Sequence, residues 1–264
     1  MIELKLCRLI ETGSGSAAWN MALDEALLSN FKEADLPILR LYRWEPSLSL
    51  GRFSKLEESV DRQKIEQSDI SYVRRMTGGG ILVHGDELSY TLILPRKSLK
   101  EKGIKESYRH LCCFLIRLYE ELGHKADFAC DQHLEGEKSD ICLATNEAYD
   151  IVIKGKKMGG NAQRHTHHAL FQHGTIPITF DRPGFESFFL TGSGLEEAAT
   201  LQSFGHQLSY DELASLVKDE FCTSFGASFR SDKLSPIEER SANELLEQKY
   251  TQKRWNIYAK YDRA

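Results

Sequence analysis

Three consecutive glycines, Gly78–Gly80, interrupt a series of short apolar runs between residues 70 and 94. Strands are expected at 70–74, directly after the glycines, and at 88–94, where Pro95 ends the run. The glycines lead straight back into an apolar, strand-like run. This part of the chain is therefore expected to consist of strands, with the glycines between two of them.

Hydrophobic periodicity predicts further elements along the chain. Strands are expected at 2–10, 37–44, 47–51, 149–153, 156–158 and 169–178. Helices are expected at 17–31, 57–67, 104–122, 210–224 and 235–249. Because hairpins outnumber strand–helix–strand crossovers, we expect a mixed α+β fold with mainly antiparallel sheets and flanking helices. We expect residues 1–205 to form the main domain and residues 206–264 a helical C-terminal extension packed on it.

The composition narrows the classes of function. A chain of 264 residues, 41% hydrophobic, can bury a large core, and its net charge of -5 argues against broad nucleic-acid binding. No apolar run approaches the roughly 20 residues that span a bilayer, and Met1–Cys7 lacks the apolar core of a signal peptide. We therefore expect a cytoplasmic protein that binds neither nucleic acid nor membrane.

The cysteines are scattered and form no CxxC pair, which favours reduced thiols over a disulfide framework. They are Cys7, Cys112, Cys113, Cys130, Cys142 and Cys222. All but Cys142 are easily interpreted as small apolar residues, as in the helical run around Cys112 and Cys113.

Two glycine-rich segments carry positive charge. Arg74 and Arg75 precede the triple glycine, and a second segment, 154–163, contains three lysines and two adjacent glycines. Glycines allow backbone amides to approach an anion closely, and arginines neutralise its charge. The first segment is thus typical of a phosphate or nucleotide cradle, although a glycine cluster can also mark only a turn.

Two other patterns in the sequence are weak indications of a site. Gly13–Ala18 fits a dinucleotide-binding fingerprint, but Asp35 precedes the next strand, and residues 2–10 alternate as a buried parallel strand would not. His165, His167, His168 and His173 match no zinc-ligand spacing, so no metal site is expected.

Lys157 is the main candidate for a functional side chain in the second segment. Lys154-Gly155 predicts a hairpin turn, and strand alternation places Lys156 and Lys157 on opposite faces. A lysine beside Gly159 and Gly160 can reach a carbonyl or a phosphate that the missing side chains admit. Lys157 is therefore the candidate, and Lys154 and Lys156 are interpreted as solvated.

Taken together, these segments resemble the lipoate-protein ligase A and octanoyltransferase family, whose catalytic domain is shared with biotin-protein ligases. The resemblance rests on motifs in this order: Asn20–Glu25, Arg74–Gly80 with His84, Gly155–Gln163, Gln172–Thr175, Lys249-Tyr250 and Trp255-Asn256. It spans nearly the whole chain, and it identifies residues 1–205 as an acyl-transfer catalytic domain of the biotinyl/lipoyl-ligase type.

The resemblance implies that a lipoyl or octanoyl group is attached to one lysine of a lipoyl carrier domain. Such domains occur in the E2 subunits of 2-oxoacid dehydrogenases and in the glycine cleavage H protein. It also implies that Lys157 contacts the acyl carbonyl. The expected substrate- and nucleotide-binding residues are Arg75, Thr77, Gly78, Gly79, Gly80, Ile81, Leu82, Val83, His84, Asp150, Gly160, Asn161, Ala162, His173 and Gly174.

The family has two branches, and the sequence carries signals of both. Ligases use ATP and Mg²⁺ to form an acyl-adenylate, and the segment 159–162 resembles theirs. Octanoyltransferases take octanoate from acyl carrier protein onto a cysteine, and Cys142, seven residues before Tyr149, resembles that nucleophile. In that branch the third residue of the glycine run is usually arginine, whereas here it is Gly80. The ATP-dependent ligase is the first prediction and the octanoyltransferase the alternative.

Overall fold

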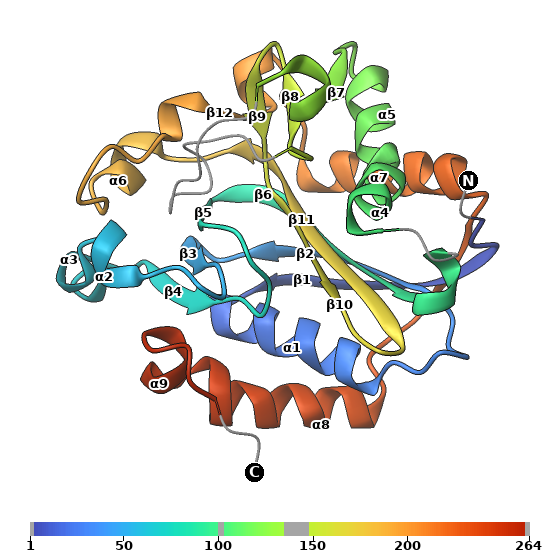
Figure 1. Ribbon diagram of the computed structural model, residues 1–264, viewed down its shortest axis with the longest axis horizontal. Helices are drawn as coiled ribbons and strands as arrows, with labels where there is room; N and C mark the ends of the chain where they lie inside the picture. The colour runs from blue at the N-terminus through green and yellow to red at the C-terminus, as the bar shows by residue number, and fades with distance from the viewer. Residues whose placement is uncertain (1–2, 100–102, 135–147, 262–264) are drawn as a thin grey trace.

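The computed structural model describes residues 3–99, 103–134 and 148–261 (Figure 1). The strands are β1 (Leu6–Gly15), β2 (Ile38–Trp44), β3 (Ser47–Leu50), β4 (Ser71–Arg74), β5 (Ile81–His84), β6 (Asp86–Pro95), β7 (Ala126–Phe128), β8 (Ile151–Ile153), β9 (Lys156–Met158), β10 (Asn161–His165), β11 (Ala169–Thr179), β12 (Ala198–Ala199) and β13 (Ser228–Ser231). The α-helices are α1 (Ala17–Asn30), α2 (Leu56–Ser59), α3 (Arg62–Glu66), α4 (Ile104–Leu111), α5 (Cys113–Glu121), α6 (Arg182–Glu186), α7 (Tyr210–Phe225), α8 (Pro236–Leu245) and α9 (Lys253–Asn256). Short 3₁₀ turns are η1 (Arg96–Leu99), η2 (Ala129–Gln132), η3 (Leu195–Glu197) and η4 (Gln202–Phe204), and η5 (Leu246–Tyr250) is a π-helical turn.

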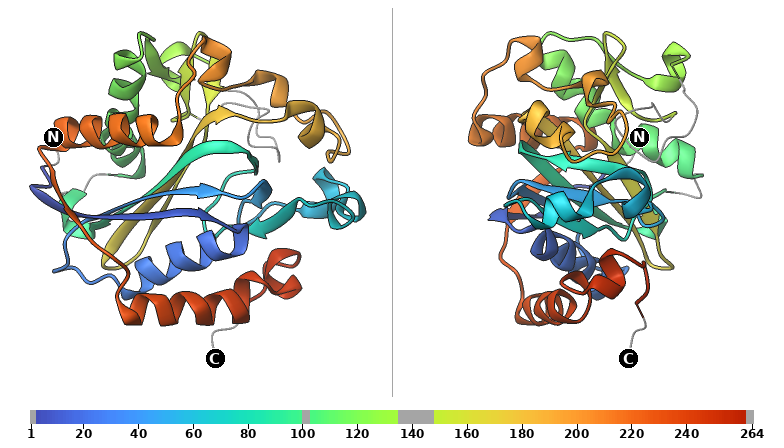
Figure 2. Two further views of the ribbon diagram at one scale, coloured as in Figure 1. Left: turned by 180° about the vertical axis from the view of Figure 1, so that it is seen from behind. Right: turned by 90° about the vertical axis from the view of Figure 1, so that its left-hand side faces the viewer.

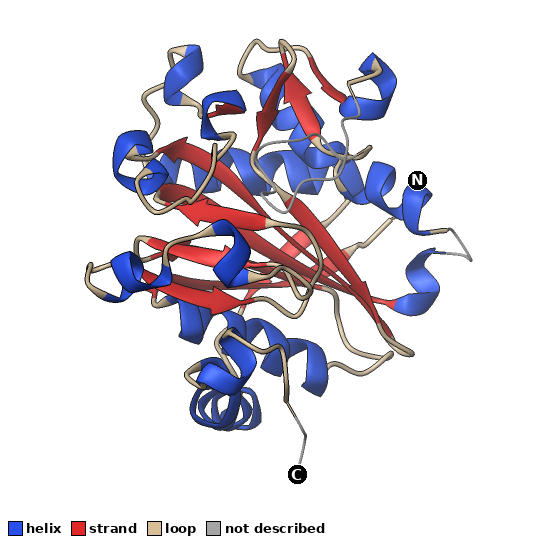
Figure 3. Ribbon diagram, turned by 60° about the vertical axis from the view of Figure 1, so that its left-hand side comes forward, coloured by secondary structure: helices blue, strands red, loops and turns tan. Residues whose placement is uncertain are grey.

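Within the described residues the strands form three sheets. The largest has six strands in the order β10-β11-β6-β2-β1-β13, and the smaller ones are β12-β9-β8-β7 and β4-β3-β5. The central ladders β2–β6, β6–β11 and β10–β11 are antiparallel. Figure 3 shows the three sheets with helices around them. The expected α+β fold with mainly antiparallel sheets is confirmed.

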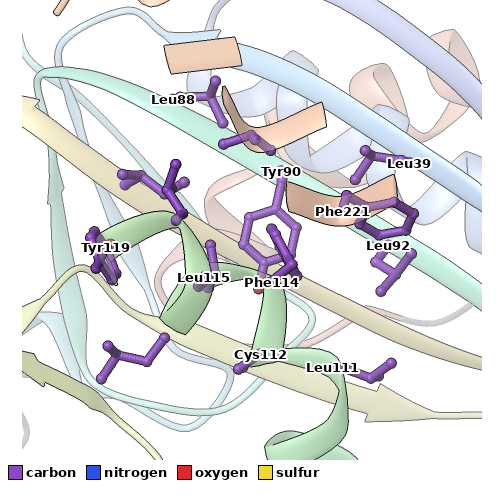
Figure 4. Close-up of a cluster of buried hydrophobic side chains, with 14 of the residues drawn as sticks. Leu39, Leu88, Tyr90, Leu92, Leu111, Cys112, Phe114, Leu115, Tyr119 and Phe221 are labelled. Atoms are coloured by element: carbon purple, nitrogen blue, oxygen red, sulfur yellow. The ribbon is translucent and has the colours of Figure 1, made fainter. Parts of the chain in front are cut away.

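Helices cover both faces of the six-stranded sheet, with α1 and α8 on one face and α5 and α7 on the other (Figures 1 and 2). Strand alternation explains this arrangement, because Leu39 and Leu41 of β2 belong to the core cluster shared with α5 and α7. Their neighbours Ile38 and Tyr42 belong to the cluster shared with α1. Figure 4 shows the first cluster, where Phe114 of α5 meets Tyr90 and Phe221.

Helix α1 begins where the sequence predicts it. The Ser16 hydroxyl accepts a hydrogen bond from the amide of Trp19, which satisfies one of the unpaired donors of the first turn. The helix is buried along most of its length and carries Asp24 and Glu25, which are both buried. Since buried carboxylates require partners, these two residues connect α1 to polar networks described below.

Several predicted elements differ from the structure. β1 extends to Gly15 and pairs in parallel with both β2 and β13, so the argument that its alternation excluded a parallel strand is wrong. The single helices expected at 57–67 and 104–122 are each divided into two. The strand β13 lies in the segment predicted to be helical and joins the main sheet. The division of the chain after residue 205 stays a prediction.

The structure also places the cysteines and the apolar segments. Cys7, Cys112, Cys113, Cys130 and Cys222 are not in disulfides, and Cys142 lies outside the described residues. Among the described residues, no helix combines the length and the apolar character that crossing a bilayer requires.

Candidate functional site

A cavity of about 170 Å³ lies where the glycine turn, β2, β10 and β11 come together. Its walls are formed by Tyr42, Trp44, Arg75, Gly78, Gly79, Leu82, His84, Tyr108, Asp150, Gly160, Asn161, Ala162, Gln163, His173, Gly174 and Thr175. Tyr42, Trp44 and His84 are almost completely buried, whereas Gly79 is exposed and Ala162 is half-buried. The cavity therefore runs from a rim near the glycine turn to an aromatic floor.

The backbone of the glycine turn has a defined polarity. Its carbonyls point into the protein: Gly79 O accepts from Ser54 Oγ at 3.0 Å, and Gly80 O accepts from the amide of Gly51 at 3.0 Å. Gly79 has a φ of +90°, a conformation that favours glycine. Within the described part of the chain, none of the three glycine amides donates a hydrogen bond. Since Gly78 and Gly79 line the cavity, these N–H groups can serve a ligand there.

The paired arginines, Arg74 and Arg75, bind different parts of the chain. Arg75 lines the cavity, and its guanidinium donates to Ser49 O at 2.6 Å and to the carbonyls of Gly78 and Gly80 at 3.2 and 2.9 Å. It thereby holds the carbonyl side of the turn. The sequence predicted that both arginines neutralise one ligand. This does not fit the geometry, because Arg74 donates instead to backbone carbonyls of residues 255–257.

Arg74 is buried and connects distant parts of the chain. Its guanidinium donates to the carbonyls of Gly51 and Ser54 at 2.9 and 2.7 Å, and to that of Asn256 at 3.1 Å. The indole nitrogen of Trp255 donates in return to Arg74 O at 2.8 Å. Arg74 therefore ties α9 to the loop that supports the glycine turn.

His84 is fixed on three sides at the floor of the cavity. Its ring stacks on Trp44 at 3.8 Å, with 9° between the planes. Nδ1 lies 2.8 Å from a carboxylate oxygen of Glu87, and Nε2 lies 2.5 Å from Ser49 Oγ. Because Arg75 also donates to Ser49 Oγ at 2.8 Å, the floor and the glycine turn share one hydrogen-bond network.

A second network supports the wall formed by β11. His173 Nε2 lies 2.8 Å from Thr77 Oγ1, and Nδ1 lies 3.4 Å from Asp24. Asp24 forms a fully buried ion pair with Arg40 at 2.7 Å. Burial alone would raise the pKa of Asp24, but Arg40 and His173 outweigh it, so this pKa lies below its ordinary value. Burial lowers the pKa of His173, against the opposing effect of Asp24, so the imidazole is neutral in the folded protein.

This buried imidazole predicts acid sensitivity of the fold. A His173 pKa below the ordinary 6.5 means that the unfolded chain binds the proton more readily, so stability falls as the pH drops from 6.5 toward the folded-state pKa. In His173→Gln, the slope of the unfolding free energy against pH should become shallower by up to about 1.4 kcal/mol per pH unit. Denaturant titrations across this range measure it. His167→Gln, at an exposed position, should keep the wild-type slope, and equal slopes for all three proteins would contradict the assignment.

Lys157 lies directly behind the cavity wall. The turn at Lys154 and Gly155, both with positive φ, forms the predicted hairpin, with Lys156 exposed and Lys157 only 1% exposed. The Lys157 ammonium donates to Asp150 Oδ2 at 2.5 Å, and Asp150 itself lines the cavity. The cation therefore reaches the cavity through its carboxylate partner, beside Gly160.

The glycines after this hairpin are required by close packing. Gly159 has a φ of +67°, and a Cβ there would lie 2.0 Å from the carbonyl oxygen of Thr175. A Cβ on Gly174 would lie 2.1 Å from Asn161 Oδ1. A Cβ on Gly160 would press against Leu82 at 3.2 Å. β10 can approach β11 and the apolar wall only because these side chains are missing.

The structure brings most of the predicted site residues to one cavity. Of the predicted set, those on its walls are Arg75, Gly78, Gly79, Leu82, His84, Asp150, Gly160, Asn161, Ala162, His173 and Gly174. Those placed elsewhere are Thr77, Gly80, Ile81, Val83 and Lys157, where Ile81 and Val83 belong to a core cluster. Cys142 lies outside the described residues.

Five wall residues were not predicted: Tyr42, Trp44, Tyr108, Gln163 and Thr175. Gln163 and Thr175 each end one of the segments that carry the resemblance, and Tyr42 and Trp44 stand at alternate positions of a predicted strand. The signal for Tyr108 is only tertiary, since its hydroxyl accepts a hydrogen bond from the amide of Gln163 at 2.9 Å.

Comparisons with known proteins cover nearly the whole chain. The family described as lipoyl protein ligase A/B catalytic domain matches residues 16–222. The octanoyltransferase LipM of Exiguobacterium sp. (strain ATCC BAA-1283 / AT1b) is 34% identical, over 94% of this chain and 96% of that protein. LipM of Bacillus subtilis (strain 168) is 28% identical, over 94% and 97%.

Solved structures with the same fold are similar over the same length. A lipoate-protein ligase A bound with ATP superposes with a TM-score of 0.82 at 28% identity, covering 97% of this chain and 98% of the other. A bipartite lipoate protein ligase from Thermoplasma acidophilum, studied with its E2 lipoyl domain, has a TM-score of 0.81 at 25% identity over 100% of both chains.

Proposed function

Because this chain belongs to the lipoyl protein ligase A/B catalytic domain family, we propose that it transfers an octanoyl group from a carrier thioester to the lysine of a lipoyl domain. The observation that carries the proposal is the cavity with an aromatic floor and, at its rim, glycine amides that donate to no acceptor among the described residues. The full-length relatives named octanoyltransferase LipM favour this reaction over the ATP-dependent ligase of our first prediction.

The cavity suits a medium-length acyl chain. Its inner part is lined by Tyr42, Trp44 and Leu82, so burial of methylene groups supplies the binding energy, about 0.8 kcal/mol each. The carbonyl end then lies near Gly78 and Gly79. Negative charge that develops on the carbonyl oxygen during acyl transfer is stabilised by their amides. Lys157 assists by neutralising the Asp150 carboxylate, which would otherwise repel this charge.

Cys142 is the proposed nucleophile, on the basis of its sequence position alone. Its thiolate attacks the octanoyl thioester, a new thioester forms on Cys142, and the carrier leaves as a thiolate that takes up a proton from solvent. The neutral amine of the lipoyl-domain lysine then attacks the Cys142 thioester. An amide bond forms, the bond to the Cys142 sulfur breaks, Cys142 is released as a thiolate, and the amine gives up one proton to solvent.

The ATP-dependent ligase remains the second candidate function. It is favoured by the close superposition on a lipoate-protein ligase A bound with ATP. In that reaction lipoate and ATP, with Mg²⁺, would form an adenylate, and Cys142 would have only a structural role.

One experiment distinguishes the two reactions. Purified protein is incubated with an apo lipoyl domain and either octanoyl-acyl carrier protein or lipoate with ATP and Mg²⁺, and the lipoyl domain is analysed by intact mass. We expect an octanoyl adduct with the thioester donor and without ATP. A lipoyl adduct that forms only with ATP would refute octanoyl transfer and establish the ligase.

Chain-length selection provides a separate prediction. Trp44 is 5% exposed and closes the aromatic floor, so Trp44→Ala should deepen the cavity. Because one methylene in an apolar pocket changes selectivity by about 10–200-fold, the kcat/KM ratio of dodecanoyl to octanoyl donors should rise at least about tenfold. Trp44→Phe, which retains a ring to stack on His84, should keep the preference for octanoyl. If Trp44→Ala lowers kcat/KM equally with both donors, Trp44 does not determine the preferred length of the acyl chain.

A further inference from the structure

A second cleft, of about 840 Å³, shares Gly78 and Gln163 with the acyl cavity. Its walls come from α1, from the loop after β3, from the turn between β10 and β11, and from the C-terminal segment around α9. It is larger than the acyl cavity, and the reaction described above assigns it no role. Two cavities that meet at the glycine turn can hold two parts of one elongated substrate.

The cleft carries an excess of positive charge. Arg52, Arg164 and Lys249 line it, against the single carboxylate of Glu25, which binds Lys249 at 2.5 Å. Within residues 3–99, 103–134 and 148–261, neither arginine has an ion pair with a carboxylate. Arg52 stacks over the Trp255 ring at 4.2 Å, and Arg164 donates to Met76 O at 3.4 Å. In a chain of net charge -5, this is a local concentration of positive charge, which attracts anions.

The cations also act on one another. Burial and then the charge of Arg164 lower the pKa of Arg52. Burial lowers the pKa of Lys249, and Arg164 and Arg52 add to this against Glu25. Neighbouring like charges destabilise each other, so an anion placed among these three cations would be bound with favourable energy.

We propose that this cleft binds the phosphopantetheine arm of the acylated carrier protein, with the phosphate held by Arg52 and Arg164. The inference rests on the proposed octanoyl transfer and assigns a site to its donor. The phosphate and the thioester lie at opposite ends of the arm, so a phosphate in the cleft directs the thioester along Gly78 to the acyl cavity. Phe53, 85% exposed, and Trp255 supply apolar surface for the arm's methyl-bearing segment.

The acceptor lysine is a poorer occupant of the same cleft. Its side chain is cationic before it reacts, so Arg52 and Arg164 would repel it. A folded acidic domain would also need a broad surface, whereas the described cleft is hollowed and continues into the acyl cavity. Charge and shape therefore favour a thin anionic arm, and binding of the lipoyl domain becomes the alternative outcome of the test.

The test compares two small donors that differ only in the phosphate: octanoyl-pantetheine 4′-phosphate and octanoyl-pantetheine. In Arg52→Ala and Arg164→Ala, KM for the phosphorylated donor should rise about tenfold, because each variant loses a charge-assisted contact. KM for the unphosphorylated donor and KM for the lipoyl domain should not change. Arg230→Ala is the matched control, since Arg230 is exposed on β13 at the opposite edge of the sheet from β10.

Direct binding separates this inference from the proposed function. If the wild-type protein transfers octanoate from no thioester, octanoyl transfer fails, but calorimetric binding of pantetheine 4′-phosphate still tests the cleft. Binding that weakens in Arg164→Ala, an exposed position where folding is not at risk, supports the site. Three results would overturn the assignment of the cleft. They are unchanged binding of pantetheine 4′-phosphate in both arginine variants, an equal rise in KM for both donors, and a rise in KM for the lipoyl domain alone.

Discussion

Lys157→Ala is expected to lower octanoyl transfer about 10²–10³-fold, a loss comparable to that of one electrostatic contribution at a developing oxyanion. The effect has two physical causes. The variant lacks the ammonium, and it leaves the Asp150 carboxylate, which lines the cavity, without this counter-ion next to the reacting carbonyl. Steady-state rates with an octanoyl thioester and a lipoyl domain measure the loss.

A structural effect has to be separated from the chemical one, because removing one partner of a buried ion pair costs about 3–5 kcal/mol of stability. The double variant Lys157→Met, Asp150→Asn removes both charges, so it should recover most of the stability and remain inactive. Lys156→Ala, on the exposed face of the same strand, should behave like the wild type. Near-normal turnover in the double variant would contradict the role of Lys157.

Cys142→Ala is expected to abolish transfer from the octanoyl thioester, with a loss of at least about 10⁴-fold, as for nucleophile removal in other acyl-transfer enzymes. The reason is that no acyl-enzyme can form without the thiolate. Intact mass after incubation of the wild-type protein with donor alone should show one octanoyl group, and peptide mapping should place it on Cys142.

The matched control is Cys130→Ala, which removes another free thiol and should keep both the adduct and the activity. Full activity in Cys142→Ala would show that the octanoyl group reaches the lipoyl domain by another route. An adduct that maps to a different cysteine would replace the assigned nucleophile.

Local sequence patterns predicted the elements whose signals are local. α1 was expected at 17–31 and is found at 17–30, because apolar spacing and the Ser16 cap agree. The hairpin around Gly155 followed from turn chemistry, and alternation placed Lys157 inward and Lys156 outward. The meeting of the glycine turn with Asp150 and Gly160 at one cavity was expected from the resemblance alone.

Other features depend on partners far apart in the sequence. β13 pairs with β1 across more than two hundred residues, and nothing within residues 228–231 signals it. β10 is polar except for Ala162, and it is a strand because β11 pairs with it at five positions and the Tyr108 hydroxyl accepts from the amide of Gln163. The acceptors of Arg75 are backbone carbonyls, which leave no trace in the sequence, so its role in holding the turn could not be predicted.

The attachment of Arg74 to the carbonyls of Trp255, Asn256 and Ile257 has a consequence for local unfolding. If residues 255–257 detach, the buried Arg74 guanidinium loses three of its acceptors, and burial without acceptors is costly. Detachment of this segment and loosening of the loop beneath the glycine turn are therefore coupled events. Hydrogen exchange in the two segments, far apart in the sequence, is expected to rise and fall together.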